Sequence, residues 1–300
     1  MSGGLMTSRR DFLKYTGAVT LAATQPQLSW AQQTLPARPI PGTDEQLAVI
    51  GLGNSQAFRS GDRDSAGQLL EIFLSRGGNY VDVGGSSALV VGELGHSMGK
   101  TDQLFLGNYL DPRDDMQDVA RSLAGAQHKS ALDLVHTRSL EGFRSSHDSY
   151  RALKEEGLVR YIGVARTGAS GFEAMAGLVD DGLVDFIQVN YSMMEPQAGE
   201  RLLPLAMDRG VGVAISRPFI NGDYFSIIRG HALPEWAAEF DCATWAQFSL
   251  KFILSHPAVT CVLTETANPE HAVDNIGAGF GRLPDDATRQ RMLAHMRGLA

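Results

Sequence analysis

Side chains suited to proton transfer stand at the ends of several short apolar runs in this sequence. Asp82, Tyr109 and His136 each lie at or just after the end of such a run. Carboxylate, phenol and imidazole groups act as general acids or bases when they are positioned beside a reacting atom. We therefore expect Asp82, Tyr109 and His136 to be the candidate catalytic residues.

The elements that must position these residues are eight short, largely apolar runs separated by amphipathic segments. The runs cover residues 47–50, 80–83, 104–106, 132–135, 161–164, 186–189, 211–215 and 260–263. Alternating strands and helices indicate parallel pairing through right-handed crossovers, and eight such units over about 250 residues fit a closed barrel. We expect an α/β fold: a (β/α)8 TIM barrel with an N-terminal β-hairpin and a C-terminal helix.

An open, doubly wound sheet is disfavoured by the first strand end. Such a sheet usually carries GxGxxG there, whereas Gly51-Leu52-Gly53 is followed by Asn54-Ser55-Gln56. The long segment from Phe219 to Asp241 follows the seventh run, on the face where barrel enzymes build their sites.

Composition and charge exclude several classes of protein. The 300 residues are 43% apolar, which suits a globular protein with a sizeable core rather than a disordered one. The formal charge of −8, without a basic run, argues against a nucleic-acid partner. The histidines lack metal-ligand spacing, so we expect no metal site. Cys242 and Cys261 do not form a disulfide scaffold; whether they pair stays open, although Cys261 falls in a buried run.

The N-terminus reads as an export signal of the twin-arginine kind. Ser8-Arg9-Arg10-Asp11-Phe12-Leu13-Lys14 precedes a modest apolar run, and Ser29-Trp30-Ala31 offers small residues for cleavage. We expect residues 1–31 to be the signal and residues 32–300 to form one barrel. Cleavage there removes three basic residues and one acidic residue, leaving a net charge of −10. The expected partner is the twin-arginine machinery, the location periplasmic or otherwise extracytoplasmic, and no stable membrane anchor is expected.

Motifs in the correct order resemble the aldo/keto reductase superfamily over nearly the whole mature chain. They are 50–53 (IGLG), 156–164 (EGLVRYIGV), 188–192 (QVNYS), 202–211, 245–251 and 269–275. The resemblance implies nicotinamide-dependent carbonyl reduction by an Asp, Tyr, Lys and His tetrad. In that tetrad the Tyr hydroxyl protonates the developing alkoxide, and the Lys ammonium lowers the Tyr pKa.

Only part of that tetrad is present. Asp82 matches the Asp, but the segment after it brings Ser87 where a Tyr belongs, and Tyr109 stands where the Lys belongs. The His matches His136 if the strand is two residues short, whereas ungapped spacing brings Arg138 there. Tyr109 with His136 near it could form a relocated acid.

The resemblance also implies a cofactor-binding set, with NAD or NADP possible. The implied residues are Gln188, Asn190, Ser216, Arg217, Asn268, Asp274 and Asn275. Gln188 would bind the nicotinamide carboxamide, while Asp274 and Asn275 would hold the adenine. Glu265 and His271 replace the cations that bind the 2′-phosphate in relatives, and a carboxylate facing a phosphate is repulsive. We therefore expect weak nicotinamide binding without preference for the phosphorylated form.

Two functions remain open at this point. The chain is either an exported aldo/keto reductase-like oxidoreductase acting on a small carbonyl compound, or a catalytically silent barrel acting as a binding or accessory protein. A metal-dependent hydrolase needs clustered His and Asp that the sequence does not show.

Overall fold

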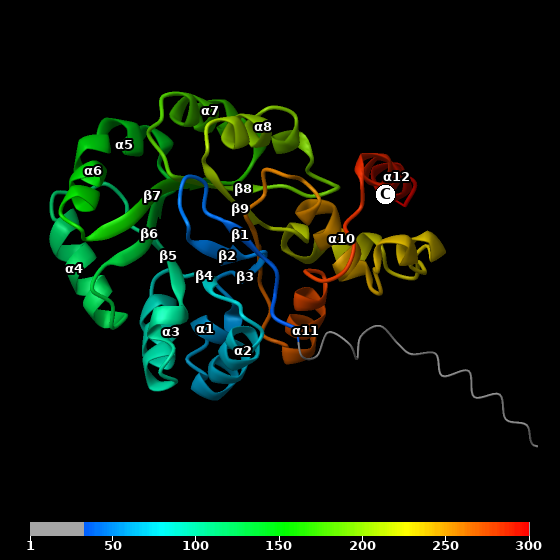
Figure 1. Cartoon of the computed structure of the whole chain (residues 1–300), viewed down its shortest axis with the longest axis horizontal. Helices are drawn as coiled ribbons and strands as arrows, with labels where there is room; N and C mark the ends of the chain where they lie inside the picture. Colours follow the sequence, from blue (N-terminus) through cyan, green and yellow to red (C-terminus); the bar gives the residue numbers. More distant parts are fainter. Residues whose placement is uncertain (1–32, 300) are drawn as a thin grey trace, which may run out of the picture.

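The computed structural model describes residues 33–299, and the export signal lies outside this range. Eight parallel strands close into a barrel in the order β10-β3-β4-β5-β6-β7-β8-β9, with helices around it (Figure 1). The strands are β3 (Ile50–Leu52), β4 (Tyr80–Asp82), β5 (Phe105–Tyr109), β6 (Leu132–Thr137), β7 (Val159–Arg166), β8 (Phe186–Asn190), β9 (Gly212–Ser216) and β10 (Cys261–Thr264). The predicted TIM barrel is confirmed.

The helices follow the strands in alternation and cover the barrel. They are α1 (Gln56–Arg59), α2 (Arg63–Ser75), α3 (Ser87–Ser97), α4 (Met116–Ala126), α5 (Leu140–Ser145), α6 (His147–Glu155), α7 (Phe172–Asp180), α8 (Leu202–Asp208), α9 (Asp223–Ile227), α10 (Trp245–Leu254), α11 (Pro269–Gly277) and the C-terminal α12 (Asp286–Arg297). Within residues 33–299 no helix has the length and apolar character needed to span a bilayer.

The run predicted as the first strand is divided between two sheets. Residues 46–48 form β2 (Gln46–Ala48), which pairs antiparallel with β1 (Ala37–Pro39), and the barrel strand begins only at Ile50. The one expected strand is therefore two strands. The sequence could not separate them, because a buried hairpin strand and a buried barrel strand have the same apolar pattern.

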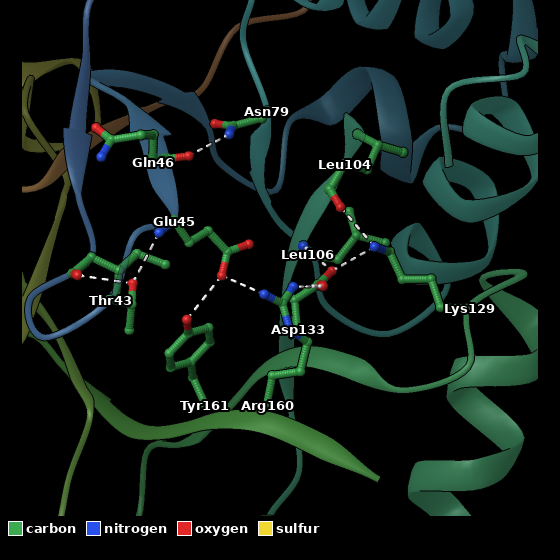
Figure 2. Close-up of polar contacts among 11 residues, drawn as sticks. Thr43, Glu45, Gln46, Asn79, Leu104, Leu106, Lys129, Asp133, Arg160 and Tyr161 are labelled. Carbon is green, nitrogen blue, oxygen red and sulfur yellow. Dashed lines mark hydrogen bonds and ion pairs between the residues drawn. The ribbon is translucent and has the colours of Figure 1, made fainter. Parts of the chain in front are cut away.

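The β1–β2 hairpin closes the N-terminal end of the barrel through a network of charged side chains (Figure 2). Arg160 on β7 bonds to Glu45 and, at 2.8 Å, to Asp133 on β6. Glu45 also accepts a hydrogen bond from the Tyr161 hydroxyl at 2.9 Å, and Lys129 lies 2.8 Å from Asp133. This end of the barrel is thereby held by the hairpin.

The barrel interior is a packed core. Ile40 and Leu47 of the hairpin region pack with Tyr80, Phe105 and other inward side chains of the strands. Lys251 on α10 is fully buried, and its ammonium donates to the backbone oxygens of Phe280 (2.6 Å) and Arg282 (3.0 Å). Both cysteines are buried and free, so no Cys242–Cys261 disulfide forms in this structure.

Candidate active site

The three candidate catalytic residues lie together at the C-terminal ends of neighbouring strands. Asp82 ends β4, Tyr109 ends β5, and His136 is the penultimate residue of β6. The strand register pairs Asp82 with Gly107 and Tyr109 with His136. Their side chains meet where TIM barrels carry out chemistry.

Asp82 is the centre of this cluster. It is 5% exposed, and its Oδ1 lies 3.0 Å from His136 Nε2. Its Oδ2 accepts hydrogen bonds from the Tyr109 hydroxyl (3.1 Å) and Gln188 Nε2 (3.3 Å). Gly107 makes room for it, since a Cβ there would lie 3.1 Å from Asp82 Oδ1 and 2.9 Å from the Tyr80 ring. Both carboxylate oxygens are therefore engaged by neighbouring side chains.

Tyr109 is held from both sides. Its ring lies 4.5 Å from the His136 ring between centroids, and the Arg138 guanidinium stacks over it at 4.0 Å. Its hydroxyl donates to Asp82 and accepts from Gln188 Nε2 at 3.2 Å. Burial, together with the Asp82 charge, raises the pKa of Tyr109 well above its usual range, and Arg138 opposes this only in part. In the family's tetrad the Lys ammonium lowers the pKa of the catalytic Tyr. Because the pKa of Tyr109 is raised instead, Tyr109 is a weaker acid than the family's Tyr, whose role it would take.

Sequence spacing matched Ser87 and Tyr109 to the family's Tyr and Lys, and that match stays a prediction. Ser87 is fully buried at the start of α3, and its hydroxyl has no hydrogen-bond partner within residues 33–299. No lysine is among the residues that line the hollow beside Asp82. The relocated Tyr109 is thus the only phenol of that lining, and its role stays a prediction.

Three connected hollows run from Asp82 across the C-terminal face. The first, about 540 Å³, is lined by Asn54, Arg59, Asp82, Tyr109, Arg138, Ala165, Arg166, Thr167, Gln188, Ser216, Arg217 and Glu265. The second, about 400 Å³, lies between Arg217 and Phe225, and the third, about 320 Å³, reaches Asp274 and Asn275. Glu265 lines all three, so the hollows adjoin at this residue, and we call the three together the groove.

Several polar atoms in the wall of the first hollow lack partners within the described chain. Gln188 Oε1, Ser216 Oγ, Arg217 Nε and Asn54 Oδ1 are buried and unbonded. Buried polar atoms normally find a partner, so unpaired atoms in residues that line a hollow are candidates for contact with a ligand or water. Arg217 also has a positive φ of 54°, a strained backbone conformation of the kind that collects at functional sites. These atoms suit a nicotinamide amide and phosphate oxygens.

Other residues of the implied cofactor set are occupied by the protein itself. Asn190 accepts from the Gly168 amide (2.8 Å) and donates to Glu195 (2.8 Å), and Asn268 caps α11 through its side chain. Neither lines the three hollows. Asp274 lines the third hollow but accepts hydrogen bonds from Thr244 and Gln247. Asn190 and Asn268 thus act as structural residues here, and their cofactor roles stay predictions.

Glu265 lies at the junction of the three hollows, against Gly53. A Cβ at position 53 would lie 2.6 Å from Glu265 Cγ, so glycine is required for this placement. Burial raises the pKa of Glu265, Arg59 opposes that shift, and Asp82 adds to it. The expectation that this carboxylate faces a 2′-phosphate stays a prediction, and the carboxylate would repel any phosphate placed beside it.

Comparison with known proteins shows which family this chain belongs to. The aldo/keto reductase family matches residues 49–226, and the twin-arginine translocation pathway signal sequence matches residues 6–24. The chain therefore belongs to the aldo/keto reductase family and carries a signal for export by the twin-arginine route.

Two curated relatives are distant. An aldo-keto reductase of Emericella nidulans, ausK, is 22% identical over 213 residues, covering 60% of this chain and 54% of its own. The NADH-specific methylglyoxal reductase of Escherichia coli K12 is 27% identical over 169 residues, covering 47% and 51%. The chain thus spans about half the length of the curated relatives it matches.

Solved structures share the fold over most of the chain. The aldo-keto reductase AKR11C1 of Bacillus halodurans, in its holo form, gives a TM-score of 0.70 at 17% identity, covering 89% of this chain and 96% of its own. An aldo/keto reductase of Klebsiella pneumoniae in complex with NADP and acetate gives 0.68 at 20% identity, covering 87% and 95%. At these identities the likeness establishes the barrel alone.

Proposed function

We propose that this chain binds a nicotinamide dinucleotide in the groove and oxidises a small alcohol beside Tyr109. The observation that carries the proposal is the hydrogen bond from the Tyr109 hydroxyl to Asp82 at 3.1 Å. Because the phenol proton is directed at a carboxylate, the phenol oxygen presents a lone pair rather than a proton to the hollow. Such a group is suited to accept a proton from a substrate hydroxyl.

The proton path uses side chains of this chain only. As the substrate hydroxyl gives its proton to Tyr109 Oη, the phenol proton passes to Asp82 Oδ2, and His136 remains bonded to Oδ1. When bound, the oxidised nicotinamide supplies an acceptor for the hydride that leaves the carbon as its carbonyl forms. Gln188, Ser216 and Arg217 would hold that group through their unpaired atoms. Reduction of an aldehyde is the same path in reverse: Asp82 must first carry a proton and return it to Tyr109 as the phenol protonates the alkoxide. Because reduction depends on this proton on Asp82, we expect reduction of generic aldehydes near background.

Cofactor binding is expected to be weak. Glu265 lines all three hollows, and its carboxylate repels a dinucleotide phosphate that lies beside it. Relatives support either nicotinamide: the Klebsiella structure contains NADP, whereas the Escherichia coli reductase is NADH-specific.

The test is turnover in both directions with the exported protein. We expect alcohol oxidation with NAD⁺ to exceed aldehyde reduction with NADH, and Asp82→Asn to reduce oxidation by about 100-fold or more, the usual contribution of a general base. Nicotinamide affinity should change little in Asp82→Asn. Aldehyde reduction at about 1 s⁻¹ or faster, within the ordinary range of enzymes, would refute the proposal.

A catalytically silent binding barrel is the second candidate. It is favoured by the engagement of both Asp82 oxygens, which leaves no free carboxylate oxygen at the hollow. Tight ligand binding with no oxidation of any alcohol in a broad panel would select it.

A further inference from the structure

The first hollow is rich in arginine for a site in an acidic protein. Arg59, Arg138, Arg166 and Arg217 line it, against two carboxylates, Asp82 and Glu265. The whole chain carries a formal charge of −8. Four arginines against two carboxylates leave an excess of positive charge in the lining, and such an excess in a concave surface attracts anionic ligands.

Arg138 and Arg166 both line this hollow and come from neighbouring strands. Arg138 directly follows β6, whose Thr137 is paired with Val164 of β7, and Arg166 is the last residue of β7. Within residues 33–299 neither of them forms an ion pair, whereas Arg217 already has a partner in Glu195, at 3.6 Å. Their charges are therefore available to a ligand.

Both arginines are also held in place. The Arg138 guanidinium stacks on the Tyr109 ring at 4.0 Å, and the aliphatic part of Arg166 lies against Gly171, where a Cβ would come within 2.6 Å of its Cγ. A stacked guanidinium keeps its N–H groups free in its own plane, and a planar fork of donors matches the two oxygens of a carboxylate.

We propose that the substrate of this site is a small hydroxy acid, with its carboxylate bound between Arg138 and Arg166. Its hydroxyl-bearing carbon then lies toward Tyr109 and Gln188, whose polar atoms line the same hollow. The inference rests on the proposed function for the reaction, but the binding of the carboxylate stands on the arginines alone. Arg138 and Arg166 are specificity-determining residues, distinct from Ser216 and Arg217 on the cofactor side.

The experiment measures binding by calorimetry, with and without NAD⁺, on the exported protein. Lactate and gluconate are the carboxylate probes, lactamide is the matched neutral probe, and glycerol 3-phosphate is the phosphate probe. We expect lactate to bind at least tenfold more tightly than lactamide, and its affinity to fall as salt is added. Equal binding of lactate and lactamide, or a phosphate probe that binds tenfold more tightly than both carboxylates, would overturn the proposal.

Variants locate the site. Arg138→Gln and Arg166→Gln should each weaken lactate binding at least tenfold, and Arg138→Lys should restore part of it. Arg151→Gln is the matched control: it removes an exposed arginine on α6 that does not line the hollow, and it should leave lactate binding unchanged. Loss of binding in Arg151→Gln equal to that in Arg138→Gln would show a general charge effect and refute the assignment.

The two proposals fail in different ways. Lactate binding that depends on Arg138, in a protein that binds no nicotinamide, refutes the proposed oxidoreductase function and supports the carboxylate site. Nicotinamide binding and oxidation of neutral alcohols, with no carboxylate preference, supports the function and refutes the site.

Discussion

Replacing Tyr109 with Phe tests the site because it removes one oxygen and keeps the ring. The ring contacts with His136 and Arg138 are retained, while Asp82 loses the 3.1 Å hydrogen bond. A hydrogen bond to a charged group contributes about 1.5–3 kcal/mol. Gln188 Nε2, already 3.3 Å from the same Asp82 oxygen, compensates in part. We therefore expect the free energy of unfolding to fall by about 1–2 kcal/mol and alcohol oxidation to fall by about 10²–10⁴-fold.

The matched control is Tyr161→Phe, at the opposite end of the barrel. Tyr161 also donates to a carboxylate, Glu45, at 2.9 Å, but it lies outside the groove. Urea titration should show a comparable loss of stability in both variants, and turnover should fall only in Tyr109→Phe. If Tyr109→Phe keeps full turnover, the phenol is a packed aromatic and the proton path is wrong. Equal loss of turnover in both variants would show that reduced stability, not the missing hydroxyl, is responsible.

Three further predictions concern export, cofactor charge and a buried amine. Arg9→Lys with Arg10→Lys should leave full-length precursor in the cytoplasm by immunoblot; normal export of the double variant contradicts the twin-arginine assignment. Glu265→Gln should tighten NADH and NADPH alike, and Glu265→Lys should tighten NADPH about tenfold or more in fluorescence titration; tight NADPH binding by the wild type, unchanged by either substitution, contradicts the placement of Glu265. Burial lowers the pKa of Lys251 from 10.5 to about 8, so between these pH values the unfolded chain binds more protons than the folded one. The free energy of unfolding should therefore rise with pH in this range, by up to about 3 kcal/mol more in the wild type than in Lys251→Met. If urea titration gives the wild type and Lys251→Met the same dependence of unfolding free energy on pH, this prediction is contradicted.

The barrel could be predicted from sequence because each strand is a short apolar run between amphipathic helices. The apolar run near residue 49 was predicted as one strand, but it contains both β2 and β3. The change from one sheet to the other could not be predicted, because both strands are buried and have the same types of side chain. The resemblance predicts that Glu265 lies at the 2′-phosphate, and that placement stays a prediction. That Glu265 lines all three hollows could not be predicted, because a position within a loop does not fix which way its side chain points.

The sequence predicted which residues form the site, but it did not predict how their side chains contact one another. Asp82, Tyr109 and His136 follow strand ends, so parallel pairing alone brings them to one face. The donation from Tyr109 to Asp82, and the stacking of Arg138 on that phenol, depend on rotamers that no spacing encodes. The sequence did not mark Arg166 as a site residue, because an arginine at the end of a strand, here the last residue of β7, is ordinarily a solvated side chain.

The hairpin that closes the N-terminal end of the barrel also sets the end of the barrel at which the described chain starts. β1 begins at Ala37, and Arg38 within it donates to the backbone oxygens of Leu254 (2.6 Å) and Val259, on the side away from the groove. The chain that the structure describes therefore starts at the N-terminal end of the barrel, and the groove lies at the opposite end. Substitutions in the hairpin can thus change the stability of the barrel while every side chain that lines the groove is kept.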